Sequence, residues 1–89
     1  MKEICICAAV RTKNGYIVRG HRHSDAMRVV RGMPDYKDEH PYGKDQGFVT
    51  SLNRYVDRIE GMKLQLDAGI PSADPLGYRS DELYSEDLY

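Results

Sequence analysis

The sequence predicts a small α+β domain in which two β-hairpins form one antiparallel sheet, two α-helices pack on it, and several copies associate. Two pairs of short apolar runs are each joined by turn residues, which is typical of hairpins. Two further segments carry helix-capping residues and an apolar stripe. The chain has 89 residues, which makes one domain with a thin core. A small-molecule pocket would therefore form more easily between subunits than within one chain.

The first hairpin is predicted from residues 3–12 and 16–20. The first run is apolar on both faces, so the chain itself or a partner must cover both sides. Asn14-Gly15 lies between the runs and favours a tight turn, because both residues tolerate positive φ. Cys5 and Cys7 lack the spacing of a metal or redox motif, so we expect small buried hydrophobes.

The first helix is expected over residues 25–32, with Ser24 as its cap and Asp25 in its first turn. Gly32 and Pro34 end it. Residues 34–45 are polar, contain two prolines and are predicted to form a mobile loop.

The second hairpin is expected from residues 47–51 and 54–56. Asp57 and Glu60 have the spacing of a capping box, which starts a helix over residues 58–68. Residues 72–89 are rich in aspartate and tyrosine and contain Pro75. This tail alone is typical of disorder, but its leucines and tyrosines predict that it docks on a surface.

The formal net charge is −1, yet the charge is unevenly distributed. Residues 1–31 hold seven Lys or Arg and two Asp or Glu, whereas residues 32–89 hold six and twelve. An arginine cluster in the first part suits an anion; alternatively, the two parts neutralise each other. Net acidity argues against binding a nucleic-acid polymer. The absence of a run of about 20 apolar residues argues against a membrane span. We expect a cytoplasmic protein.

One candidate site is the polar segment around the start of the first helix. It contains His21, Arg22, His23, Asp25 and Arg28. Arginine forks, histidine donors and a helix N-terminus together suit a phosphate group. The alternating histidines and aspartate could instead hold a metal, or the segment could be only a strand end and a helix cap.

The second candidate site contains Phe48, Asp57 and Arg58. An aromatic ring close to arginines suits a nucleobase, which stacks while its phosphates are clamped. The alternative is that Phe48 belongs to the core. Arg58 is unfavourable at a helix start, so we expect it to meet an anion or an acid such as Glu86 or Asp87. No nucleophile elbow or phosphate loop is present, and the sequence therefore predicts a binding protein without enzymatic activity, cofactor or metal.

Several segments together resemble a known family of small phage proteins. They are RHSDAM at residues 22–27, QGFVTSLNRYVDRIEG at 46–61 and LYSEDLY at 83–89. The resemblance is to the Thoeris anti-defence family, type one, and covers residues 4–70 and 83–89. Members act as sponges that sequester immune signals of the host.

The resemblance implies a single nucleotide-sequestering domain over residues 1–89, active in the host cytoplasm. It would bind cyclic ADP-ribose isomers made by a bacterial immune TIR enzyme, in pockets at a dimer interface, without cleaving them. Some members also bind CBASS cyclic di- or trinucleotides, and dimers can assemble into hexamers. The segments containing His21 to Arg28, Phe48, and Asp57 and Arg58 match the regions where the family binds its nucleotide.

Two other functions stay open at this point. A metal-dependent nucleotide hydrolase would use His21, His23 and Asp25. An inhibitor of a host protein would act through the acidic, tyrosine-rich tail at residues 72–89.

Overall fold

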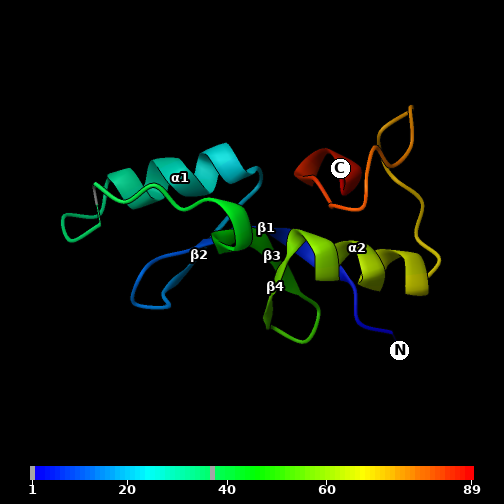
Figure 1. Ribbon diagram of the computed structural model, residues 1–89, viewed down its shortest axis with the longest axis horizontal. Coiled ribbons are helices and arrows are strands. Elements are labelled where there is room, and N and C mark those ends of the chain that lie inside the picture. The colour runs from blue at the N-terminus through cyan, green and yellow to red at the C-terminus, as the bar shows by residue number, and fades with distance from the viewer. Residues whose placement is uncertain (1, 37) are drawn as a thin grey trace.

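The computed structural model describes residues 2–36 and 38–89 and confirms the α+β prediction. Four antiparallel strands form one sheet in the order β2-β1-β3-β4, and two helices accompany it (Figure 1). The elements are β1 (Cys5–Arg11), β2 (Ile17–Gly20), α1 (His23–Arg31), β3 (Gln46–Thr50), β4 (Tyr55–Asp57) and α2 (Arg58–Asp67), with short 3₁₀ turns η1 (Gly43–Asp45) and η2 (Ser85–Asp87). Neither helix is long and apolar enough to cross a membrane, among the residues described.

Both predicted hairpins are present, and their turns share one geometry. The Thr12 carbonyl accepts a hydrogen bond from Gly15 N at 2.9 Å, and the Thr50 carbonyl accepts one from Asn53 N at 2.8 Å. Gly15 and Asn53 have φ values of 80° and 60°. Each turn thus places a single left-handed residue before the returning strand. In the first turn, Gly15 alone takes positive φ, and Asn14 does not.

The helices and the tail cover one face of the sheet. The α1 half of the core contains Val10, Val18, Ala26 and Val30. The α2 half contains Cys5, Ala8, Phe48, Val56, Met62 and Leu83. In Figure 1 the two helices lie along the same side of the sheet, and the C-terminal segment, in red, lies beside α2 and near the start of α1. This arrangement brings both helix N-termini close to the tail.

The second face of the sheet has no helix and is covered by long side chains. The Tyr55 ring lies over Gly47, where a Cβ atom would come within 2.9 Å of a ring carbon. The Arg11 guanidinium lies 4.9 Å from the centre of that ring, and Tyr55 Oη donates to the Lys44 carbonyl at 2.7 Å. Burial raises the pKa of Tyr55 to about 12. The chain itself therefore covers part of this face, and a partner subunit stays a prediction.

An aspartate accepts a backbone hydrogen bond at the start of each helix, but only the start of α2 was predicted correctly. Asp57 caps α2 by accepting a hydrogen bond from Glu60 N at 2.8 Å, which confirms the prediction. In contrast, α1 begins at His23 rather than near residue 25, and Ser24 is not its cap. The carboxylate of Asp25 reaches back and accepts a hydrogen bond from Arg22 N at 3.0 Å. The longer reach of an acidic residue at the third helical position explains the earlier start.

The tail docks on its own domain. Leu83 has no exposed surface, and its amide donates to the Arg58 carbonyl at 3.0 Å. Asp87 is 2% exposed and accepts hydrogen bonds from Ser72 Oγ at 2.5 Å and from Tyr84 N at 2.9 Å. These contacts hold the last residues against α2 and the sheet. Of the loop predicted to be mobile, 34–45, residue 37 lies outside the described residues.

Candidate functional site

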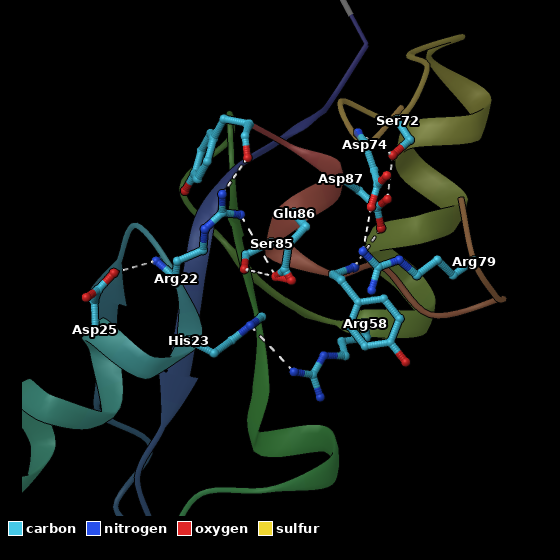
Figure 2. A network of polar contacts seen from close by, with 12 residues as sticks. Arg22, His23, Asp25, Arg58, Ser72, Asp74, Arg79, Ser85, Glu86 and Asp87 are labelled. Carbon is cyan, nitrogen blue, oxygen red and sulfur yellow. Dashed lines mark hydrogen bonds and ion pairs between the residues drawn. The ribbon is translucent and has the colours of Figure 1, made fainter. Parts of the chain in front are cut away.

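The N-termini of α1 and α2 and the tail surround one open hollow of about 460 Å³. Its lining residues are Arg22, His23, Ser24, Arg58, Tyr84, Ser85 and Glu86. Figure 2 shows Arg22 and His23 on one side, Arg58 on another and Glu86 between the two arginines. Because helix N-termini carry partial positive charge, this end of the molecule is favourable for an anion.

His23 is held neutral and in one orientation. Its Nε2 lies 2.7 Å from the Gly47 carbonyl, which can only accept, so this nitrogen carries the proton. Burial lowers the pKa of His23 below its ordinary value. The ring stands edge-on to Phe48, with centroids 5.2 Å apart. The remaining nitrogen, Nδ1, faces Arg58 Nη2 at 3.5 Å and can accept a hydrogen bond from it (Figure 2).

Arg58 is oriented from three sides. Its Nη2 donates to Gln46 Oε1 at 2.8 Å, and its guanidinium carbon lies 5.4 Å from the centre of the Tyr84 ring. Arg58 Nε is buried and has no hydrogen-bond acceptor among the described residues. Among the described residues, Arg58 forms no ion pair with Glu86 or Asp87, because Gln46, His23 and Tyr84 hold its guanidinium. The prediction of an acidic partner is therefore wrong, and the alternative of an anion stays a prediction. A buried donor without an acceptor is costly in water-poor surroundings.

Arg22 is held by the last residue of the chain. Its Nη2 donates to the backbone oxygen of Tyr89 at 2.7 Å, and its guanidinium carbon lies 5.4 Å from the centre of that ring. The same ring stacks on His21, with centroids 4.1 Å apart and planes 18° apart. Arg22 Nη1 is buried, has no hydrogen-bond acceptor in the described part of the chain and lies 3.9 Å from Glu86 Oε1.

Of the residues that the structure describes, Glu86 is the one acidic residue that lines the hollow. Ser85 Oγ donates to its Oε1 at 2.9 Å. This hydrogen bond is the main reason why the pKa of Glu86 lies below its ordinary value, and Arg22 adds to the effect. The lining therefore holds two cations, one carboxylate and a neutral imidazole.

The structure brings together some of the predicted site residues. Arg22, His23 and Arg58 line the hollow, although Arg58 is 35 residues away from His23 in the sequence. His21 lies at the edge of this group through its stacking on Tyr89.

The other predicted site residues have different roles. Asp25 and Asp57 accept backbone hydrogen bonds at the helix starts. The Arg28 side chain is 78% exposed, pairs with Asp25 at 3.5 Å and does not line the hollow. Phe48 is completely buried in the core, so it offers no face to a base. Instead, it packs against the His23 ring in an edge-to-face contact.

Nothing in residues 2–36 and 38–89 forms a cluster of three or more His, Cys, Asp or Glu side chains that could hold a metal ion. Of the three ligands considered for a metal, His23 is bonded to the sheet through Nε2, His21 stacks on an aromatic ring and Asp25 caps a helix. These three side chains therefore make separate contacts and do not converge on one point.

Sequence reasoning did not assign the tail to the site, although it named Glu86 as a partner of Arg58. Tyr84, Ser85, Glu86 and Tyr89 complete the hollow or orient its arginines, and Gln46 at the start of β3 holds Arg58. The leucine- and tyrosine-rich composition of the tail indicated docking, but nothing local indicated where. Only the fold of the tail over α2 places the four tail side chains beside Arg22 and Arg58.

Comparison with known proteins gives one match. A family model described as "Phage T4 y16D protein" matches residues 4–89. No curated protein and no solved structure matches the chain.

Proposed function

The chain belongs to the phage T4 y16D protein family, and from that premise we propose that it is an anti-defence sponge. It binds cyclic nucleotide immune signals of the host, cyclic ADP-ribose isomers first and CBASS cyclic di- and trinucleotides second. It sequesters them intact in the host cytoplasm. Tight binding lowers the free signal below the concentration that the defence effector needs.

The observation that carries this proposal is a pair of arginines, Arg22 and Arg58, that line one hollow and whose hydrogen-bonding capacity is not fully used. Arg22 Nη1 and Arg58 Nε both lack acceptors among the described residues. Phosphate oxygens are strong acceptors for arginine, and such charge-assisted hydrogen bonds are about twice as strong as neutral ones. A ligand with two phosphates can satisfy both arginines at once.

Aromatic groups next to these arginines support a nucleotide rather than a simple anion. The Tyr84 ring lines the hollow next to Arg58, and the Tyr89 ring contacts both His21 and Arg22. A ring paired with a guanidinium group, such as Tyr84, provides a stacking surface for a base. It takes the place that the sequence assigned to Phe48.

Sequestration without cleavage fits the side chains of the hollow. Ser85 is 2% exposed, so its hydroxyl is buried away from a ligand in the hollow, although it donates to Glu86. His23 Nδ1 faces a guanidinium and is therefore not free to take a proton from a ligand or a water molecule.

The open shape of the hollow favours a site completed by a second copy of the chain. A site that encloses most of the ligand surface binds it more tightly than an open one, and one chain supplies only an open hollow. The proposal therefore includes a homodimer, with the hexamer as a further assembly, and two copies of the hollow in each dimer.

Calorimetric titration with cyclic ADP-ribose isomers and cyclic di- and trinucleotides tests the function, with the mass of the complex measured alongside. We expect tight binding with at most one ligand per subunit. Ligand recovered after heat denaturation should be chemically unchanged, as judged by mass spectrometry. Degraded ligand would show that the protein is an enzyme and not a sponge. No binding across the panel would refute the proposal.

A further inference from the structure

An ionised carboxylate is unexpected at a hollow that is built to bind anions. Glu86 lies at the lining, 3.9 Å from Arg22 Nη1. Removing it would leave the hollow more positive and, for any phosphate, more attractive. Its presence therefore requires an explanation beyond anion binding.

Glu86 does not simply neutralise Arg22. At 3.9 Å the two groups form an ion pair without a hydrogen bond, and Nη1 stays without an acceptor. The carboxylate is instead held by Ser85 Oγ at 2.9 Å. Ser85 is 2% exposed and anchored in η2, so the carboxylate is fixed beside the arginine from the tail side. Figure 2 shows Ser85 and Glu86 facing the space between Arg22 and Arg58.

We propose that Glu86 determines specificity by selecting phosphates that carry one negative charge each over terminal phosphates that carry two. This inference rests on the proposed function and names the ligand class of the same site. Arg22 and Arg58 attract every phosphate, and Glu86 repels each additional charge that approaches Arg22.

We call this selection by charge the filter. It depends on how many negative charges a phosphate group carries. A terminal phosphate has a second pKa near 6, so its charge is about −1.5 to −2 at neutral pH. A phosphate that is linked on both sides, through ester or anhydride bonds, keeps a single charge. The proposed cyclic ligands contain only such phosphates, whereas linear nucleotides such as ADP and ATP end in a terminal phosphate. The filter would therefore disfavour these linear nucleotides.

The test is a comparison of cyclic ADP-ribose with ADP, which share adenine and two phosphates but differ in the terminal charge. Both are titrated calorimetrically into the full chain and into Glu86→Gln, which keeps the shape and removes the charge. The affinity ratio of cyclic ADP-ribose to ADP should fall by about two- to fivefold in Glu86→Gln, the effect of one charge at a partly exposed site. Glu86→Asp keeps the charge and should retain most of the preference.

Glu60→Gln is the matched control. Glu60 also pairs with an arginine, Arg54, at 3.3 Å but lies outside the hollow, so this variant should keep the wild-type ratio. Thermal melting shows that each variant is folded.

The outcomes separate the inference from the function on which it rests. If the wild-type chain binds cyclic ADP-ribose and Glu86→Gln keeps the same ratio, the filter is refuted and the sponge stands. A variant that loses cyclic ADP-ribose but not ADP would also refute the filter, because Glu86 would then bind a ligand donor directly. If the wild-type chain binds neither compound, both proposals fail together.

Discussion

Arg58 occupies a position that is unfavourable for a cation in an isolated helix. It is the first residue of α2, where the partial positive charge of the helix end repels a cation. Gln46, His23 and Tyr84 nevertheless orient its guanidinium toward the hollow. Arg58 therefore lowers the stability of the helix start, which is typical of a residue retained for binding.

Replacement of Arg58 by glutamine should weaken binding of cyclic ADP-ribose by about 1.5–3 kcal/mol, the usual contribution of a hydrogen bond to a charged group. The free energy of unfolding should stay nearly the same, since an unfavourable charge is removed from the helix start. Titration calorimetry and urea unfolding measure the two quantities. Arg28→Gln serves as the control because its side chain is 78% exposed and outside the hollow. Equal losses in both variants would contradict the assignment of Arg58.

His23 makes the stability of the fold depend on pH. Burial holds its pKa in the folded protein below the ordinary 6.5. As the pH falls through about 6.5, the unfolded chain takes up a proton that the folded protein does not. The free energy of unfolding should therefore decrease with falling pH, until the pH reaches the pKa of the folded state.

The variant His23→Gln tests this dependence. Its amide can donate to the Gly47 carbonyl and accept from Arg58, but it does not titrate. Urea unfolding between about pH 7.5 and about pH 5.5 should show a smaller loss of stability in the variant than in the wild-type chain. The same loss in both would show that His23 is not the group responsible.

At the scale of the elements, α2 begins with an N-cap residue whose own side chain accepts a backbone hydrogen bond, whereas α1 does not. Asp57 accepts a hydrogen bond from Glu60 N at 2.8 Å, while the Glu60 side chain pairs with Arg54 rather than with the cap backbone. One half of the predicted capping box is thus formed. The Asp57 carboxylate also lies at the positive end of the helix, which is favourable.

Asp57→Ala should lower the free energy of unfolding by about 0.5–2 kcal/mol, because the cap and its charge are lost together. Asp57→Asn should retain most of the stability, since asparagine caps about as well. Urea unfolding of both variants at neutral pH is the measurement. If asparagine is as destabilising as alanine, the cap hydrogen bond is not the way in which Asp57 stabilises the protein.

At the scale of the whole molecule, the tail is part of the core rather than an appendage. Leu83 fills the space among Cys5, Phe48 and Met62 and has no exposed surface. A chain this small buries little apolar area, so one leucine matters greatly. The tail also supplies Tyr84, Ser85 and Glu86 to the hollow, so folding and the proposed binding depend on the same segment.

Leu83→Ala should lower the free energy of unfolding by about 2–5 kcal/mol, as expected for a buried leucine. Leu76→Ala is the matched control, because Leu76 is 88% exposed in the same tail, and its effect should stay within about 0.5 kcal/mol. Chemical unfolding followed by circular dichroism compares the two. Similar small effects would mean that the tail contributes little to the core.

The sequence by itself determined the features that depend on neighbours in the chain. The two hairpins follow from turn residues between apolar runs, and the start of α2 follows from an aspartate three residues before a glutamate. These interactions span only a few residues, so a local pattern carries them. The start of α1 was placed two residues late because Ser24 and Asp25 are both plausible caps, and a local pattern does not rank them.

Only the tertiary structure decided which side chains meet at the hollow. Arg22 is bonded to a residue 67 positions away, and Arg58 is placed by the sheet and the tail. The burial of Phe48 depends on the helix and tail that cover it, as the neutrality of His23 depends on its own burial. Composition indicated arginines, an aromatic partner and an anion. Their arrangement depends on packing between distant segments, which is a property of the whole fold and of no single segment.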